Sequence, residues 1–324
     1  MRDVRWFAPN AFATLIVPRL QQLGLTIATE GDEPARLAVA MSGTAAERAW
    51  RYARKHGCPY LLYIWDLPPW RLGTGHPDFV WWGLGRFFRL PPLRRRYRQS
   101  RGYYSRLRFM AARARAVWAP SRASVESVTE RFGVDCAHVP YCYDSSRFVP
   151  LARGTDAPPR SPYILTVSRL EPSKNQQAVL RAAAELSPAL PVHLIGWGSE
   201  EGALRRLAAE LAVDCSFASG LSDADVVTAY RQASVVVCPS RFEGFGLSPI
   251  EATACGTRVV ASDIAPHREF VGRAARFFSL DDVRDLVTAI RGALAGSPPD
   301  PAAVQPLTIP AAAERFAAGL TTLL

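Results

Sequence analysis

Short apolar runs that alternate with helical segments constrain the fold of this 324-residue chain most strongly. The runs at 60–65, 163–168 and 234–239 have the length of single strands and are apolar almost throughout. Such runs are typical of strands that are buried on both faces of a sheet. Because such runs alternate with helical segments along the chain, we expect an α/β fold with parallel, doubly wound sheets. In sheets of this kind, ligands bind beyond the carboxyl ends of the strands.

The length of the chain suits two domains of ordinary size. We expect a Rossmann-like N-terminal domain at 1–150 and a Rossmann-like C-terminal domain at 163–324, with the last helix able to cross back to the first domain. The segment 151–162 is rich in proline and polar residues and is interpreted as the linker. No apolar run is long enough to span a bilayer. The six cysteines lack the spacing of a zinc site, which favours a cytoplasmic protein that binds no structural metal.

The segment 79–125 has an unusual composition for a globular domain. It contains no acidic residue, and its arginines are interleaved with pairs of aromatic residues. Such a segment could lie on an anionic membrane surface, as a peripheral protein does on the inner face of a membrane. It could equally hold an anionic acceptor, or form a solvated basic helix in a chain whose net charge of +10 comes from arginine. We expect no nucleic-acid partner, because no nucleic-acid-binding module surrounds the segment.

The most informative stretch is 241–252, which follows the apolar run 234–239. Its glycines, Gly244 and Gly246, allow the backbone to come close to a ligand. A helix is expected to start at Ser248, which would be the N-cap. A strand, a glycine-bearing turn and a helix start together direct free backbone N–H groups at an anion.

Two carboxylates, Glu243 and Glu251, bracket this turn. Carboxylates are poor partners for phosphate but good acceptors for the hydroxyl groups of sugars. The stretch therefore predicts a ligand with phosphate in its middle and a polyol at each end, such as a nucleotide-sugar. Glu251 is also expected to close a capping box with Ser248.

The stretch 241–252 resembles the donor-binding signature of retaining glycosyltransferases of the GT-B fold, family 4 type. The likeness continues through 255–262 and extends from about residue 115 to the end of the chain. It is thinner over the first hundred residues, where Pro9 and Asn10 replace a Gly-Gly pair that many members carry. The resemblance implies two Rossmann-like domains facing a central cleft. It also implies transfer of a hexosyl group from a UDP- or GDP-sugar with retention of configuration and without a tightly bound cofactor.

The resemblance also assigns roles to individual residues. Glu243 would contact the donor sugar and Glu251 the ribose. Arg169 and Lys174, on a loop after the run 163–168, would neutralise the departing diphosphate, because a guanidinium fork and an ammonium both bind phosphate oxygens. Asp66, after the run 60–65, would lie on the acceptor side. The other expected donor contacts are Gly196, Gly198, Gly244, Phe245, Gly246 and Leu247.

Alternative functions stay open at this point. An epimerase or phosphorylase of the same fold would act on a related substrate, and a non-catalytic protein could bind the sugar nucleotide without transferring it. Asp223-Ala224-Asp225 has the form of a metal-binding Asp-x-Asp motif, but we interpret these acids as the first turn of a helix capped by Ser222. The acceptor is expected to be a glycan, a lipid-linked molecule or a small molecule.

Overall fold

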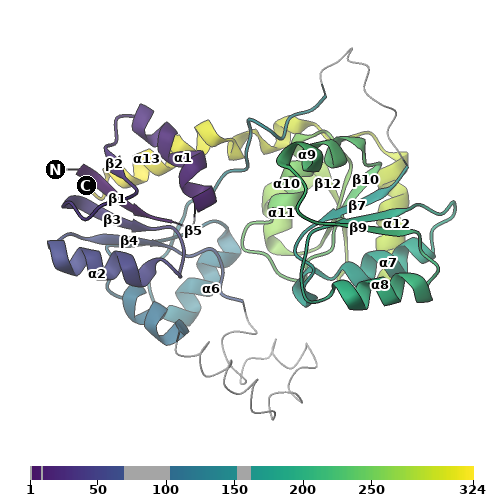
Figure 1. Ribbon diagram of the computed structural model, residues 1–324, viewed down its shortest axis with the longest axis horizontal. Coiled ribbons are helices and arrows are strands. Elements are labelled where there is room, and N and C mark those ends of the chain that lie inside the picture. Colours follow the sequence, from purple (N-terminus) through teal and green to yellow (C-terminus); the bar gives the residue numbers. More distant parts are fainter. Residues whose placement is uncertain (1, 9, 69–102, 152–161) are drawn as a thin grey trace, which may run out of the picture. The chain divides into compact units, whose positions relative to one another are not determined.

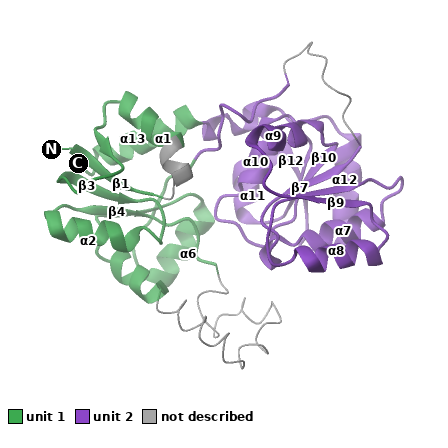
Figure 2. Cartoon of the chain, in the orientation of Figure 1, with its two compact units in different colours: residues 1–141, 309–324 green, residues 142–308 purple. Residues whose placement is uncertain are grey.

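The computed structural model describes residues 2–8, 10–68, 103–151 and 162–324 (Figure 1). The chain folds into two compact units, which are described separately (Figure 2). Unit 1 comprises residues 1–141 and 309–324, and unit 2 comprises residues 142–308. The units thus divide after Tyr141, earlier than the expected boundary at 150. Most of the predicted linker, residues 152–161, lies outside the described residues.

Unit 1 contains a six-stranded parallel sheet with the order β2-β1-β3-β4-β5-β6. The strands are β1 (Arg2–Phe7), β2 (Ile27–Ala28), β3 (Ala35–Ala40), β4 (Tyr60–Tyr63), β5 (Ala116–Ala119) and β6 (Ala137–His138). The labelled helices of this unit are α1 (Asn10–Gln22), α2 (Ala46–His56), α6 (Arg122–Phe132) and α13 (Ile309–Thr321).

Helix α13 belongs to unit 1 although it is the last helix of the chain. It packs against α1, and its Phe316 is fully buried. The Phe316 ring lies 5.6 Å from both Tyr63 and Trp118, measured between ring centroids. A Cβ atom at Gly319 would come within 2.7 Å of the Trp118 ring, so this position of α13 requires a glycine. The helix is therefore part of the core of unit 1.

Unit 2 contains a second six-stranded parallel sheet, with the order β12-β11-β10-β7-β8-β9. The strands are β7 (Ile164–Val167), β8 (Val192–Ile195), β9 (Cys215–Ala218), β10 (Val235–Cys238), β11 (Val259–Ser262) and β12 (Ala275–Phe278). The α-helices are α7 (Gln176–Ala184), α8 (Glu201–Glu210), α9 (Asp223–Gln232), α10 (Leu247–Ala254), α11 (Ala265–Val271) and α12 (Val283–Ala295). Three 3₁₀ helices complete the unit: η2 (Pro172–Lys174), η3 (Gly272–Ala274) and η4 (Pro301–Leu307).

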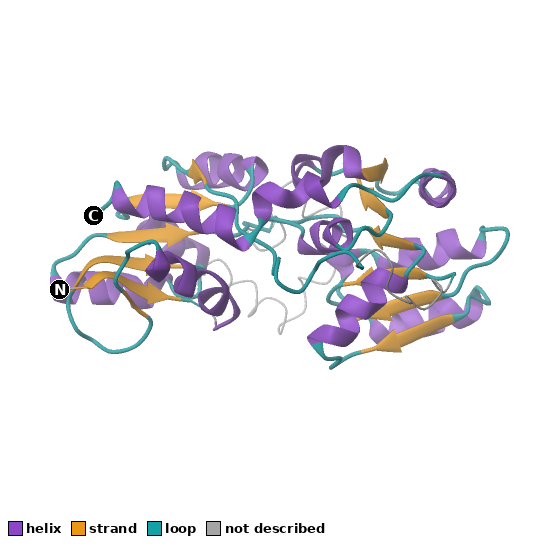
Figure 3. Ribbon diagram, turned by 90° about the horizontal axis from the view of Figure 1, so that it is seen from above, coloured by secondary structure: helices purple, strands orange, loops and turns teal. Residues whose placement is uncertain are grey.

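The apolar runs in unit 2 are explained by the position of their strands. Helices cover both faces of the sheet (Figure 3), and the alternating residues of β7 and β10 enter two separate hydrophobic clusters. Ile164 and Val235 belong to one cluster, whereas Leu165 and Val236 belong to the other. The prediction of an α/β fold with two parallel, Rossmann-like sheets is therefore confirmed.

Only part of the basic segment 79–125 can be compared with its prediction, because 79–102 lies outside the described residues. In the described part, residues 103–111 are helical, and the buried side chains of Tyr104, Leu107 and Met110 join the core of unit 1. Phe109 is half-exposed, and the Arg113 guanidinium lies 3.6 Å from its ring centroid. Across the described residues, no helix combines the length and the apolar character that crossing a membrane requires.

Candidate functional site

The predicted ligand-binding stretch lies at the topological switch point of unit 2. After β7 the chain continues to β8 and β9 on one side, whereas β10, β11 and β12 lie on the other side. Strands β7 and β10 are therefore neighbours, with Val235 aligned with Ile164. The crevice beyond the carboxyl ends of two such strands is where doubly wound sheets bind their ligands. The loop 168–175 leaves β7 at this edge, and the loop 239–246 leaves β10.

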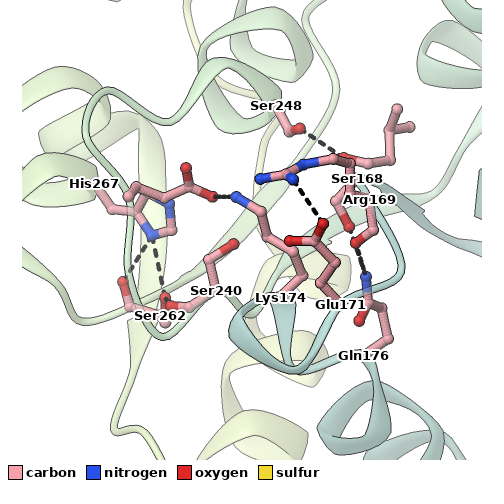
Figure 4. A network of polar contacts seen from close by, with 11 residues as sticks. Ser168, Arg169, Glu171, Lys174, Gln176, Ser240, Ser248, Ser262 and His267 are labelled. Atoms are coloured by element: carbon pink, nitrogen blue, oxygen red, sulfur yellow. Dashed lines mark hydrogen bonds and ion pairs between the residues drawn. The ribbon is translucent and has the colours of Figure 1, made fainter. Parts of the chain in front are cut away.

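Hydrogen bonds hold these two loops together (Figure 4). The Ser248 hydroxyl donates to the backbone oxygen of Val167 at 2.6 Å, and the backbone N–H of Arg241 donates to the oxygen of Ser173 at 2.8 Å. The buried Gln176 amide donates to the Ser168 hydroxyl at 2.8 Å and to the Arg169 oxygen at 2.7 Å. Because the backbone of both loops is fixed in this way, their side chains are presented by a rigid frame.

The predicted N-cap at Ser248 is wrong. Helix α10 begins at Leu247, and its N-cap is Gly246, whose φ of 82° lies in the left-handed region that favours glycine. The Ser248 hydroxyl is already bonded to Val167 of the neighbouring loop, so it does not cap the helix. The predicted capping box with Glu251 is absent for the same reason.

The structure brings together Lys174 and Glu243, which are 69 positions apart in the sequence. The Lys174 ammonium donates to Oε1 of Glu243 at 2.5 Å (Figure 4), and the two side chains are only 14% and 19% exposed. Burial alone would raise the pKa of Glu243, but Lys174 and then His267 lower it below its ordinary value. Glu243 is therefore an ionised carboxylate at neutral pH, paired with a cation that could also bind phosphate.

Glu251 has a different electrostatic environment. Its Oε2 accepts a hydrogen bond of 3.0 Å from the hydroxyl of Tyr230, which is fully buried. Burial raises the pKa of Glu251 to about 7, against the smaller opposing effect of that hydrogen bond. The two carboxyl groups predicted for the donor therefore differ in charge: Glu243 is ionised, and Glu251 is only partly ionised at neutral pH.

Arg169 is the most exposed of the predicted charged site residues in unit 2. Its side chain is 53% exposed, and it donates to Oε1 of Glu171 at 2.6 Å. In Figure 4 the Arg169 guanidinium and the Lys174 ammonium point toward the same region. Because such exposed ion pairs contribute little stability, Arg169 can exchange Glu171 for an anion.

The glycines Gly196 and Gly198 allow the turn after β8 to lie against the loop after β7. A Cβ atom at Gly196 would be 1.9 Å from the Ser168 oxygen, and one at Gly198 would be 2.2 Å from the Leu170 oxygen. The backbone N–H of Leu170 donates to the oxygen of Trp197, between the two glycines, at 2.8 Å. The Trp197 side chain itself is 67% exposed. The turn thus presents an aromatic ring beside the Arg169 loop.

The remaining predicted contacts surround the start of α10. Phe245 is buried and packs on Phe270 at 4.5 Å between ring centroids. Gly244 and Gly246 are also buried, whereas Leu247, the first residue of α10, is half-buried. These residues shape the loop, and the charged groups around it carry its chemistry.

Asp66 belongs to unit 1. It follows β4, which ends at Tyr63, so it lies beyond the carboxyl end of that strand as expected. The backbone around it is held by two hydrogen bonds: the Trp65 indole donates to the Met41 oxygen at 2.6 Å, and the Ser124 hydroxyl donates to the Trp65 oxygen at 3.0 Å. The half-buried Asp66 is thus at a fixed position, and its acceptor role stays a prediction.

The Asp223-Ala224-Asp225 sequence starts α9, as predicted from the residues around it. Ser222 is the N-cap, and its hydroxyl accepts from the backbone N–H of Asp225 at 3.2 Å. Asp225 completes a capping box by accepting from the backbone N–H of Ser222, while Asp223 pairs with Arg147. Both acids therefore have structural partners at the helix start.

Three residues of this region were not among the predicted site residues. Tyr230 is the hydrogen-bond donor to Glu251, Trp197 is the exposed ring, and His267 is a buried neighbour of Gly246. A tryptophan between two glycines at a strand end is a signal that the sequence does contain. No local pattern identifies Tyr230 or His267, because both reach the site only through the packing of α9 and α11.

Comparisons with known proteins agree with this geometry. Residues 152–303 match the family described as glycosyl transferases group 1. A stretch of 141 residues, 41% of this chain, is 35% identical to the serotype-specific mannosyltransferase WbdA of Escherichia coli and covers 17% of that protein. A stretch of 153 residues, 42% of this chain, is 35% identical to D-inositol 3-phosphate glycosyltransferase 2 of Catenulispora acidiphila and covers 36% of it. The chain therefore matches well under half of each of these relatives.

Solved structures resemble the whole chain. The structure of HepE from Anabaena in complex with UDP aligns with a TM-score of 0.70 over 99% of this chain and 100% of the other, at 15% sequence identity. At this identity the likeness concerns the fold alone, and that fold is GT-B. The Lys174–Glu243 pair thus lies within residues 152–303, the part of the chain that matches the group 1 glycosyl transferases.

Proposed function

We propose that this chain is a retaining glycosyltransferase of family 4 type, which transfers a hexosyl group from a UDP- or GDP-sugar to an acceptor hydroxyl. The observation that carries the proposal is the Lys174–Glu243 pair at the switch point of a group 1 glycosyltransferase domain. A cation for phosphate and a carboxylate for sugar hydroxyls share one rigid pair of loops. A nucleotide-sugar has these two kinds of group next to each other.

In this proposal the diphosphate lies between the loop after β7 and the start of α10. Lys174 and Arg169 bind its oxygens and stabilise the negative charge that develops as the sugar leaves. The amino terminus of α10, which no side chain of the described residues caps, adds the positive end of its dipole. The chemistry assigned to these groups is electrostatic stabilisation of a leaving nucleoside diphosphate.

Carboxyl groups hold the two polyol ends of the donor. Glu243 accepts hydrogen bonds from the sugar, and Glu251 binds the ribose. Glu251 has a pKa of about 7 and accepts a hydrogen bond from Tyr230, so both its ionised and its protonated forms are present at neutral pH. The ionised form can accept from a ribose hydroxyl, and the protonated form can donate to one. Support for UDP as the nucleotide comes from HepE, whose solved complexes contain UDP and UDP-glucose.

The acceptor side is assigned to unit 1 through Asp66, with a glycan, a lipid-linked molecule or a small molecule as the acceptor. The basic segment 79–125 would hold an anionic acceptor or lie on an anionic membrane. Vesicles with and without anionic lipid distinguish these two roles. Salt-sensitive sedimentation with anionic vesicles would support the membrane surface.

The first test is a thermal-shift panel of UDP, GDP, ADP and CMP, each with and without EDTA. We expect one nucleoside diphosphate to raise the melting temperature, and EDTA to leave that shift unchanged, because the assigned groups are side chains and backbone dipoles. Incubation with the matching nucleotide-sugar and candidate acceptors then tests transfer, and the anomeric configuration of the product tests retention. Binding without transfer or hydrolysis would favour a non-catalytic sugar-nucleotide-binding protein, and conversion without acceptor would favour an epimerase.

A further inference from the structure

His267 is a buried histidine next to the donor loop. It lies on α11, its side chain is 1% exposed, and its ring is in contact with the start of α10. A Cβ atom built on Gly246 would be 3.0 Å from Cδ2 and 3.3 Å from Nε2 of this ring. The imidazole thus lies directly against the turn that is assigned to the phosphates. Figure 4 shows it in the same polar network as Lys174.

The hydrogen bonds of His267 define where its proton resides. Nδ1 lies 3.0 Å from the backbone oxygen of Ser262, which can only accept, so the proton is on Nδ1. The Ser262 hydroxyl, 3.2 Å from Nδ1, donates its own proton to the oxygen of Ser240 at 2.5 Å. In the neutral ring Nε2 therefore carries a lone pair. This buried atom has no hydrogen-bond partner among the described residues.

Two charged side chains dominate the electrostatics of His267. Burial lowers its pKa, Glu243 opposes this effect, and Lys174 reinforces it. The ring is therefore neutral in the free protein at neutral pH, and Lys174 is the cation that balances Glu243. Glu243 and His267 thus affect the pKa of each other, and Lys174 lowers the pKa of both.

Diphosphate binding would disturb this balance. When phosphate oxygens bind Lys174, Glu243 must share the ammonium with which it is paired. A carboxylate that is 19% exposed is poorly compensated by water, so a second positive charge nearby becomes favourable. The Nε2 atom of His267 can acquire that charge without breaking its existing bond to Ser262.

We propose that binding of a nucleoside diphosphate at Lys174 is coupled to the uptake of one proton by His267. The inference rests on the proposed donor site. The proton comes from solvent and binds to Nε2, while Nδ1–H continues to donate to Ser262. The resulting imidazolium offsets part of the negative charge of the ligand and holds Glu243 in its ionised form for the sugar. His267 is thus a positioning residue that acts through Glu243.

Several charged or titratable side chains lie on the elements that pack around His267. Helix α10, which packs on α11, carries the ionisable side chain of Glu251, η3 carries Arg273, and η4 carries no ionisable side chain. On α11 itself, Arg268 pairs with Asp263 and stays charged, and Glu269 is the acidic residue. Among these groups, Glu251 has a pKa of about 7 and could also take up a proton, so the comparison with His267→Gln below assigns the uptake to one of the two side chains.

The test is isothermal titration calorimetry of the full chain with UDP and GDP in buffers that differ in ionisation enthalpy. The titrations are done between pH 7 and 8.5, above the range near pH 6 where a terminal phosphate itself titrates. We expect an uptake approaching one proton for each bound nucleotide. The dissociation constant should rise by up to about tenfold for each pH unit, which is the limit for coupling to one proton.

The variant His267→Gln retains a polar group at the position of Nε2 but cannot be protonated. It should bind the same nucleotide with no proton uptake and with a dissociation constant that is flat over this pH range. His193→Gln is the matched control, since His193 is a half-buried histidine of the same sheet that stacks on Tyr163 at 4.1 Å. Its variant should retain the wild-type uptake.

The outcomes separate this inference from the proposed function. Nucleotide binding without proton uptake in the wild type, or equal uptake in His267→Gln, would overturn the role of His267 and leave the donor site intact. Should His267→Gln not fold, nucleotide binding by the wild type without proton uptake still overturns the inference, and uptake that is retained in Glu251→Gln still supports it. Failure of every nucleoside diphosphate to bind would overturn the proposed donor site together with this inference.

Discussion

Replacing Glu251 by glutamine should stabilise the free protein at alkaline pH. Burial raises the pKa of this carboxyl from 4.5 to about 7, which means that the folded state holds the proton more tightly than the unfolded chain. Stability from this group is therefore fully present below pH 4.5 and is lost as the pH rises through 7. At about 1.36 kcal/mol per pH unit, the raised pKa lowers the unfolding free energy, relative to low pH, by about 3 kcal/mol at pH 8 and by about 1 kcal/mol at pH 5.

Glutamine keeps the shape of the side chain and an oxygen that accepts from Tyr230, but it cannot ionise. Urea unfolding of wild type and Glu251→Gln at pH 5 and pH 8 measures the effect. The gap in unfolding free energy between the two proteins should shift by about 2 kcal/mol in favour of the variant from pH 5 to pH 8. In a domain of this size, that difference moves the melting temperature by about 4–8 °C.

Glu210→Gln, at the exposed end of α8, is the matched control. It should change the unfolding free energy by less than about 0.5 kcal/mol at either pH, as surface substitutions usually do. A gap between wild type and Glu251→Gln that is the same at pH 5 and pH 8 would refute the reasoning. Such a result would mean that the carboxyl is ionised in the folded protein at both pH values.

Further substitutions test the phosphate loop, the sugar contact and the glycine turn. Arg169→Ala and Lys174→Ala should each weaken binding of the nucleoside diphosphate by about ten- to a hundredfold in calorimetry, the range for charge-assisted hydrogen bonds; unchanged affinity in both would remove them from the phosphate site. Glu243→Ala should reduce the rate of transfer far more than binding of the bare nucleotide, and an unchanged rate would exclude it from the site. Gly198→Ala should destabilise the chain by more than about 2 kcal/mol, because its Cβ would lie 2.2 Å from a backbone oxygen of the neighbouring loop. Its control is Gly202→Ala in α8, where the nearest atom is 3.8 Å away and the change should be neutral or stabilising by up to about 1 kcal/mol in thermal melts.

The fold and the position of the site were predictable because they depend on patterns that tertiary structure preserves. Fully apolar runs such as 234–239 have no solvent-facing alternation, so they belong in the middle of a covered parallel sheet. Lys174 and Glu243 each follow such a run. The two side chains come together because β7 and β10 are neighbours in the sheet, as the strand order of doubly wound, dinucleotide-binding sheets predicts.

The errors and omissions have a different physical origin. Ser248 has the local sequence of an N-cap, but its hydroxyl donates a hydrogen bond to the backbone oxygen of Val167 in a neighbouring strand. The conformation of Gly246 then determines where α10 starts. Likewise, Tyr230 and His267 reach Glu251 and Gly246 from helices that are adjacent only in space. Sequence patterns report local conformational preference, whereas the positions and hydrogen bonds of these residues depend on partners that are distant in the sequence.

The polar groups of the site are not explained by the stability of the fold. Glu251 is destabilising when ionised, and the buried Lys174–Glu243 pair must offset its own desolvation. The Nε2 atom of His267 is buried without a hydrogen bond among the described residues, which is also unfavourable. Apolar side chains at these positions would pack into the same sheet edge without such penalties. A ligand that supplies an anion for Lys174 and hydroxyl groups for the carboxylates would offset these energetic penalties. Variants such as Glu251→Gln should therefore gain stability in the free protein and lose affinity for the nucleotide.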